Sequence, residues 1–192
     1  MSKVTIEKNL FCLPWTQTLL GTHFEGRVNF MALDWLTRVN YSPAMIGICV
    51  NKMNASHSAI LETREFSINV PSAEMMALTD YAGIVSGKKA DKSKLFEVFY
   101  GGLKFAPMIV NCPVTMECRL AQPVELPTNS FFIADIVNIY TEERFMTDGK
   151  PDVKKMNPFV LTMPDNRYWA IGDCIGKAWH EGIAVRDRLK QE

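Results

Sequence analysis

Prolines interrupt the second half of this chain so often that long helices have little room there. A proline ring fixes φ and removes the backbone N–H, which breaks a helix interior and also disfavours a central strand. We therefore expect a mainly β protein with short helices inserted, and a β-barrel with helical additions is the natural architecture. The prolines in question are Pro107, Pro113, Pro123, Pro127, Pro151, Pro158 and Pro164.

Strand-length apolar runs and period-two alternation predict most of the sheet. The clearest pattern is residues 65–70, where apolar and polar side chains alternate until Pro71 ends the run. Glu25 and Gly26 form a turn signal between two strand-like segments, which predicts a hairpin. The predicted strands are residues 15–22, 28–33, 44–50, 65–70, 114–121, 131–140 and 159–163.

Two short helices are predicted between these strands. Asn54 or Ser56 can cap a helix that runs through Thr63, because their side-chain oxygens accept otherwise unpaired helical N–H groups. Ser72 can cap a second helix, which Gly83 can end.

Charge and length limit the function classes. The 192 residues include 21 Lys+Arg and 21 Asp+Glu, and 47% are of hydrophobic types, which is typical of a globular protein. Zero net charge argues against a nucleic-acid coat protein, whose affinity depends on phosphate neutralisation. Without repeats or linkers, we expect a single domain over residues 1–192. Apolar runs are too short to cross a bilayer, and Lys3 and Lys8 interrupt any signal-peptide pattern, so a cytoplasmic protein with no membrane partner is expected.

The cysteines and histidines do not form a metal motif. Five cysteines are spread along the chain without a C-x-x-C pair, and only three histidines are present. We expect free thiols in a reducing compartment and no dedicated metal site. These residues are Cys12, Cys49, Cys112, Cys118, Cys174, His23, His57 and His180.

The sequence does not match the familiar catalytic and nucleotide-binding motifs. Residues 83–89 superficially suggest a phosphate-binding P-loop, but only three residues separate the glycines, and Lys89 stands where Ser or Thr should hold magnesium. No dinucleotide-binding G-x-G-x-x-G, zinc-protease helix or G-x-S-x-G nucleophile elbow occurs. The sequence therefore leaves the catalytic residues unknown.

Four segments make better sense as one site than separately: residues 29–35, 52–58, 86–92 and 168–176. Each alone also has a structural interpretation. Met31 and Trp35 could belong to the core, Ser56 could only cap a helix, and the lysines of residues 88–92 could be a solvated loop face.

The order of these segments resembles the flavin reductase-like proteins with an FMN-binding split β-barrel, a group that includes flavoredoxin. The resemblance runs over residues 14–182. Its motifs are Asn29-x-Met31-Ala32-x-x-Trp35 followed by Ser42-Pro43, then Ser56-His57 with Ile60, the strand Phe66 to Pro71, and Ser86-Gly87 followed by Asp91-Lys92.

The resemblance implies FMN as the cofactor and a role for each motif. Lysine, hydroxyl and backbone donors suit the phosphate of FMN, and Lys92 and Ser56 are the first candidates for it. Residues 29–32 would lie along the flavin ring with their backbone amides towards its polar edge, and Met31 and Trp35 would pack around it. The predicted cofactor-binding residues are Asn29, Phe30, Met31, Ala32, Trp35, Lys52, Ser56, His57, Ser86 and Lys92.

One departure from the family pattern concerns the electron donor. The family often has Gly-Asp-His before the strand that begins here near Ser130, and its histidine is implicated in nicotinamide handling. Here Asn129 stands in that place, and an amide cannot act as an acid or base. FMN binding is unaffected, whereas direct oxidation of NADH or NADPH is left open.

Three functions remain open at this point. The first is an FMN-dependent oxidoreductase that passes electrons from NAD(P)H or another donor to a flavin, a partner protein or a small acceptor. The second is a non-catalytic FMN-binding electron carrier or storage module, which Asn129 favours. The third is a haem-binding barrel with His23 or His180 as the axial ligand. The resemblance also implies a homodimer with the cofactor near the subunit interface.

Overall fold

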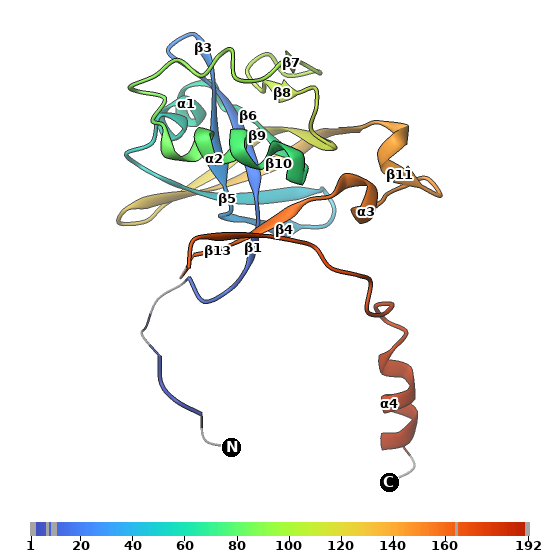
Figure 1. The fold of residues 1–192 in the computed structure, drawn as a ribbon. Coiled ribbons are helices and arrows are strands. Elements are labelled where there is room, and N and C mark those ends of the chain that lie inside the picture. The colour runs from blue at the N-terminus through green and yellow to red at the C-terminus, as the bar shows by residue number, and fades with distance from the viewer. Residues whose placement is uncertain (1–2, 7, 9–10, 164, 191–192) are drawn as a thin grey trace.

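The computed structural model describes residues 3–6, 8, 11–163 and 165–190, so Pro164 lies outside the described residues. Its main feature is an antiparallel seven-stranded sheet with the order β3-β2-β6-β9-β10-β5-β4 (Figure 1). The strands are β2 (Thr18–Phe24), β3 (Arg27–Leu33), β4 (Leu36–Asn40), β5 (Met45–Asn51), β6 (Glu65–Val70), β9 (Val114–Glu125) and β10 (Asn129–Thr141).

The two edge strands of this sheet are neighbours in the sequence. β3 and β4 stand at opposite ends of the strand order, yet only Asp34 and Trp35 separate them in the chain. Such a short connection brings the two edges together, so the sheet must curve into a barrel. We call the junction formed by Asp34 and Trp35 the seam. It is the place where the barrel wall has a gap in its hydrogen-bond ladder.

Alternation along the strands fills the barrel. In β5, Ile46, Ile48 and Val50 are buried in the core, whereas the alternate residues Met45 and Cys49 are half-buried. The same core cluster includes the fully buried rings of Phe66 and Phe132. Burying each such side chain contributes about 1.5–3 kcal/mol, so this cluster is the main source of the barrel's stability.

Two short helices cover one region of the barrel. α1 (Ala55–Thr63) packs against β2, and α2 (Met76–Ile84) packs against β3 after the 3-10 turn η1 (Ala73–Met75). Between α2 and the sheet lies a second apolar cluster. It contains Leu19, Phe30, Met75, Ala82, Phe96, Ile109 and Cys112.

A smaller sheet lies beneath the barrel in Figure 1. It consists of β1 (Trp15–Thr16), β13 (Phe159–Thr162) and β14 (Arg167–Ala170), in the order β1-β13-β14. The Tyr168 hydroxyl on β14 donates a hydrogen bond to Asp80 on α2 at 2.7 Å, which links this sheet to the helical layer. The remaining elements are β7 (Val98–Phe99), β8 (Met108–Ile109), η2 (Glu143–Phe145), β11 (Met146–Thr147), β12 (Lys150–Pro151) and α3 (Val153–Met156).

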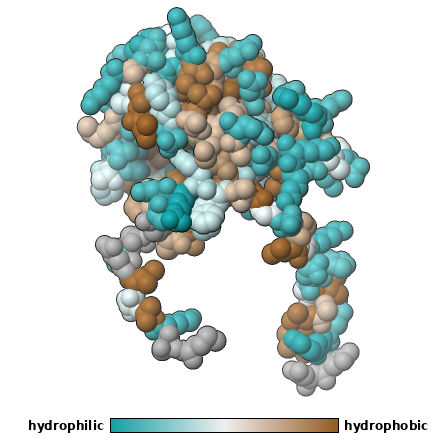
Figure 2. Space-filling model, in the orientation of Figure 1, coloured by the Kyte–Doolittle hydropathy of each residue, from teal (hydrophilic) through white to brown (hydrophobic). Residues whose placement is uncertain are grey.

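Residues 171–190 leave the body of the molecule as an arm that ends in α4 (Gly182–Leu189) (Figure 1). Figure 2 shows this arm standing apart from the barrel with apolar side chains along it. Ile175 and Trp179 are 103% and 97% exposed. The Lys154 ammonium holds the start of the arm through the Gly172 carbonyl at 2.7 Å and the Asp173 carboxylate at 2.9 Å.

The predicted mainly β fold with short helices is confirmed. β6 has the predicted bounds, and the hairpin around Glu25 is β2–β3. β9 continues past the predicted end at Ala121 and through Pro123. The proline is tolerated because β6 pairs with β9 only as far as Arg119, so this part of β9 has one neighbour.

Two predicted helix caps were wrong, and some elements were not predicted. Asn54 stands at the start of α1 but makes no side-chain cap, and the Ser72 hydroxyl donates to the Glu74 carboxylate instead of capping a helix. β4 was not predicted because it is an exposed edge strand without an apolar pattern. The exposed helix α4 was not predicted either.

Candidate functional site

A cavity of about 160 Å³ lies between β3, the start of α1 and the loop after α2. The chain brings these three segments together because α1 packs on β2 and α2 packs on the neighbouring strand β3. Five of the ten predicted cofactor-binding residues meet here. The lining is Asn29, Met31, Asn54, Ala55, Ser56, Ala82, Gly83, Ile84, Val85, Ser86, Gly87 and Lys92.

Asn29 and Ser56 form the polar wall of this cavity. The Asn29 amide nitrogen donates to the Ser56 hydroxyl at 3.1 Å and to the Thr22 hydroxyl at 3.4 Å. Its Oδ1 atom is buried and has no hydrogen-bond partner. A buried polar atom without a partner costs about 1–3 kcal/mol, so this acceptor is a place where a ligand's N–H or O–H would be stabilised.

Gly87 allows the loop to approach this wall. A Cβ atom added at Gly87 would clash with the Asn29 amide oxygen and approach the Cβ of Ala55 at 3.3 Å. The Ser-Gly pair of the sequence motif therefore has a steric explanation, because a larger residue at Gly87 would push the loop off β3.

The N-terminus of α1 supplies a positive end to the cavity. Ala55 and Ser56 are buried in its first turn, and that turn contains no acidic side chain. Since the first N–H groups of a helix lack intrahelical partners and the helix dipole is positive there, an anion bound at this position would be stabilised.

The Lys92 side chain is buried at the cavity wall, at 4% exposure. Its ammonium donates to the Val85 carbonyl at 2.8 Å and to the Ala82 carbonyl at 3.0 Å. Burial lowers the pKa of Lys92 to about 8. The lysine thus anchors the end of α2, and because an ammonium has three N–H bonds, one remains for a ligand.

Lys52 and His57 lie in a network beside the cavity rather than on its lining. The Lys52 ammonium pairs with the Glu125 carboxylate at 2.8 Å, and Ser130 donates to the same carboxylate at 2.9 Å. His57 Nε2 lies 2.8 Å from the Ser130 hydroxyl. Burial is the main cause that lowers the pKa of His57, with Lys52 and Lys88 adding to it and Glu125 opposing it. His57 is therefore a neutral hydrogen-bonding group at neutral pH.

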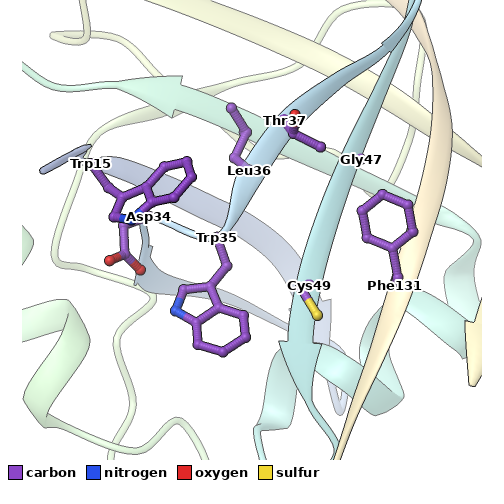
Figure 3. A pocket seen from close by; sticks show the side chains of 8 residues that line it. All are labelled: Trp15, Asp34, Trp35, Leu36, Thr37, Gly47, Cys49 and Phe131. Carbon is purple, nitrogen blue, oxygen red and sulfur yellow. The ribbon is translucent and has the colours of Figure 1, made fainter. Parts of the chain in front are cut away.

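Three predicted residues do not point into this cavity. The Phe30 ring is fully buried in the cluster under α2 and makes an edge-to-face contact with Phe96 at 5.2 Å between centroids. Ala32 lies against Gly83 of α2. Trp35 lines a separate cavity at the seam (Figure 3). Alternation along β3 turns Phe30 and Ala32 away, because adjacent residues of a strand face opposite sides. Trp35 lies beyond the end of β3, at the seam.

Asn129 and the two histidines considered as haem ligands lie outside the lining of this cavity. Asn129 begins β10, and its amide lies 3.7 Å from the Cys49 sulfur. The His23 ring contacts the Tyr100 hydroxyl at 2.7 Å, and His180 lies on the exposed arm beside Glu181. Neither histidine lines the cavity described here, so the structure offers no support for haem ligation by them.

Sequence reasoning missed several members of the site. Gly83 and Val85 contribute through backbone at the end of α2, which leaves no side-chain signal. Glu125 and Ser130 were missed because each is ordinary in its own strand, and only the register of β9 against β10 brings them to His57.

The described part of the chain has neither a metal-ligand cluster nor a membrane-spanning helix. Among the residues that the structure describes, no group of three or more His, Cys, Asp or Glu side chains could hold a metal ion. No helix in the described part of the chain is both long enough and apolar enough to span a bilayer.

These features fit an elongated ligand with an anionic end. The helix N-terminus, Lys92 and the Ser86–Gly87 loop favour the anion, and Asn29 offers an acceptor. Cavities that enclose a whole drug-sized ligand measure about 300–1,000 Å³, so this one encloses only part of such a molecule. The rest would extend along β3, an edge strand whose outward N–H and C=O groups have no strand partner.

Comparison with known proteins gives a consistent result. Residues 10–156 match the model of the flavin reductase like domain. The structure is similar to flavoredoxin from Methanosarcina acetivorans, with a TM-score of 0.94 and 49% identity, covering 96% of this chain and 100% of that one. It is also similar to flavoredoxin of Desulfovibrio vulgaris, with a TM-score of 0.86 and 26% identity, covering 94% and 100%. A protein of Archaeoglobus fulgidus is 32% identical over 127 residues, which cover 65% of this chain and 71% of the relative.

Proposed function

The chain belongs to the flavin reductase-like family, and from this premise we propose that it is an FMN-binding oxidoreductase with the split-barrel fold. The observation that carries the proposal is the cavity between β3, α1 and the loop after α2. It combines a helix N-terminus, a buried lysine and an unpaired buried acceptor, which together suit a phosphate joined to a polar chain.

Each part of the cavity has a role towards FMN in this proposal. The α1 N-terminus, Ser56, Ser86 and the remaining N–H of Lys92 hold the phosphate. Asn29 Oδ1 accepts a hydrogen bond from the ribityl chain. The outward backbone of β3 lies along the flavin ring, and Met31 packs against the ring. Lys52 and His57 set the electrostatic potential at the mouth of the cavity. Bound FMN supplies the redox chemistry, and these residues bind and orient it.

We propose that electrons reach the cofactor from NAD(P)H or another donor and leave to a flavin, a protein or a small acceptor. The alternative is a carrier without its own turnover. Asn129 favours the carrier, because its side-chain amide cannot act as a general acid or base. The five free cysteines fit the reducing cytoplasm, where we propose the protein works.

The cofactor proposal predicts selective binding of phosphorylated flavin. We expect the purified protein to show oxidised-flavin absorbance, and apoprotein to bind FMN at least roughly tenfold more tightly than riboflavin, since the charged hydrogen bonds go to the phosphate. Fluorescence titration with the two flavins measures this ratio. Equal affinities would contradict the phosphate cradle, and a Soret band would contradict a flavoprotein.

Anaerobic mixing with NADH and with NADPH separates the enzyme from the carrier. We expect the bound flavin to lose its visible absorbance with at least one of them in stopped-flow measurements. If neither nicotinamide bleaches the flavin while dithionite does, the chain is an FMN carrier or takes electrons from a different donor.

We also propose that two copies of the chain form a homodimer through the arm. Residues 171–190 expose Ile175 and Trp179 to solvent, and α4 has no buried residue. An eight-residue helix is marginal in water on its own, because helical stability comes mostly from packing an apolar face. A second copy can supply that packing symmetrically.

Truncation after Ala170 tests this assignment. We expect the full chain to run as a dimer and the truncated chain as a monomer in size-exclusion chromatography with light scattering. The lost contacts of Lys154 with the arm are solvent-exposed and contribute little to stability, so the barrel should stay folded. A circular dichroism spectrum checks the fold, and a truncated chain that remains dimeric would show that the interface lies elsewhere.

A further inference from the structure

A larger cavity, of about 520 Å³, lies between the β7–β8 ribbon and the ends of β9 and β10 that lie next to it. In Figure 1 this ribbon lies on the side of the barrel away from the small sheet. None of the residues of this cavity lines the first cavity, in which we place FMN. Its volume is that of a cavity that encloses a whole small ligand. The lining includes Phe99, Val110, Thr115, Tyr140, Glu142 and Arg144.

Thr115 is the buried polar residue of this cavity. Its side chain is 2% exposed, and its hydroxyl oxygen has no hydrogen-bond partner among the residues that the structure describes. Met116 and Cys118 face the barrel core, so alternation along β9 turns Thr115 to the opposite side, towards β7 and β8. A buried hydroxyl without a partner destabilises the fold, and a ligand's polar group beside it would remove that penalty.

Two aromatic rings form an apolar wall beside the Thr115 hydroxyl. Tyr140 on β10 is the direct cross-strand partner of Thr115, so the two side chains are neighbours on one face of the sheet. Phe99 of β7 meets the Tyr140 ring edge-to-face, with 5.7 Å between centroids. The Tyr140 hydroxyl donates to the buried Glu117 carboxylate at 2.9 Å, which fixes the ring in place. A flat ring of a ligand would pack against this wall.

An ion pair stands at the exposed mouth of the cavity. The Arg144 guanidinium donates to the Glu142 carboxylate at 2.7 Å, and their side chains are 61% and 53% exposed. A guanidinium has five N–H bonds and a carboxylate has two oxygens, so each can bind a further group of opposite charge while the pair stays together. The mouth therefore offers a positive and a negative group side by side.

We propose that this cavity binds a free aromatic amino acid whose ring ends in a hydrogen-bonding group, as in L-tyrosine. The α-carboxylate of the ligand binds Arg144 and its α-ammonium binds Glu142, so charges of alternating sign meet at the mouth. The ring packs against Phe99 and Tyr140, and the ring hydroxyl bonds to Thr115. L-phenylalanine would leave the Thr115 hydroxyl unpaired. A relative of L-tyrosine without its carboxylate or its ammonium would leave one charge of the ion pair unmatched.

This inference goes beyond the proposed FMN site and does not depend on it. Glu125 and Ser130, which belong to the network beside the first cavity, lie at one end of the β9–β10 pair, and Thr115 and Tyr140 lie towards the other end. We therefore expect L-tyrosine to bind equally to apoprotein and to protein loaded with FMN. A ligand in the first cavity would instead compete with FMN.

The test compares L-tyrosine with three relatives in NMR titrations of the whole protein. L-phenylalanine lacks the ring hydroxyl, tyramine lacks the carboxylate and desaminotyrosine lacks the ammonium. We expect L-tyrosine to bind roughly threefold to tenfold more tightly than each of them. Thr115→Val should remove the preference over L-phenylalanine, and Arg144→Gln should remove the preference over tyramine.

Thr16→Val is the matched control, because Thr16 is exposed on β1 and should leave both preferences unchanged. Thr115→Val should not lower the midpoint of urea unfolding, since the hydroxyl that it removes has no partner. A preference lost in this variant therefore does not come from misfolding. The backbone amide signals of Thr115 and Arg144 should shift on binding, and that of Ser56 should not.

Absence of saturable L-tyrosine binding, competition with FMN, or an unchanged preference in either Thr115→Val or Arg144→Gln would each overturn the proposal. Because these titrations need no bound flavin, their failure leaves the titration with FMN and riboflavin as a separate test of the FMN site.

Discussion

Replacing Lys92 by methionine is expected to lower FMN affinity roughly ten- to hundredfold. Methionine keeps an unbranched stem but removes the ammonium that donates to the Ala82 and Val85 carbonyls. The loop after α2 loses its anchor, and the phosphate loses a buried positive charge. Riboflavin has no phosphate, so we expect its affinity to fall less than that of FMN. Fluorescence titrations of apoprotein with both flavins measure the two effects.

The pH dependence of FMN binding provides an independent signature of Lys92. Its pKa lies near 8, so the side chain is protonated below that pH and loses its charge above it. We expect FMN affinity to fall as the pH rises from 7 to 9 in the native protein, and this fall to be much smaller in Lys92→Met. Lys89→Met is the control, because Lys89 is exposed in the same loop. An equal fall in FMN and riboflavin affinity in Lys92→Met would show that Lys92 only supports the loop, and an unchanged FMN affinity would show that it contributes nothing to binding.

Replacing Phe30 by alanine is expected to cost about 3–5 kcal/mol of the free energy of unfolding. The Phe30 ring is fully buried and packs edge-to-face on Phe96, so its removal leaves a void beneath α2. With a urea m-value of about 1–3 kcal/mol per molar, the midpoint of unfolding should fall by at least about 1 M.

Met31→Ala is the partner experiment, because Met31 is next on β3 and lines the first cavity. We expect it to weaken FMN binding with a smaller loss of stability, since Met31 is only half-buried. If Phe30→Ala left stability unchanged and lost only FMN affinity, the Phe30 ring would face the cofactor instead of the core.

Much of the fold could be predicted from the sequence where one face of a strand is buried. β6 was predicted with its exact bounds because its apolar side chains alternate and Pro71 ends it. β4 was not, since its residues after Leu36 are exposed and leave no pattern. The extension of β9 through Pro123 depends on where β6 stops pairing, which is a property of the sheet and not of the local sequence.

In the candidate site, too, residues in local motifs could be predicted, whereas contacts between distant parts of the chain could not. Asn29, Ser56 and Lys92 were predicted from motif order, and all three line one cavity. The hydrogen bonds of Lys92 to two backbone carbonyls could not be predicted, because carbonyls have no residue-specific signal. Phe30 and Trp35 do not line that cavity. Strand alternation turns Phe30 into the cluster under α2, and the turn at the seam places Trp35 on a separate cavity.

The seam also bears on how the protein avoids aggregation. Edge strands with unpaired backbone groups are templates for pairing with other chains, and an open seven-stranded sheet would offer two of them. Here β3 and β4 are those edges, and the two-residue connection through Asp34 and Trp35 brings them to one corner beside Trp15 of the small sheet. FMN bound along β3, as we propose, would cover backbone that could otherwise recruit another strand. Apoprotein should therefore be more prone to aggregate than the FMN-bound protein.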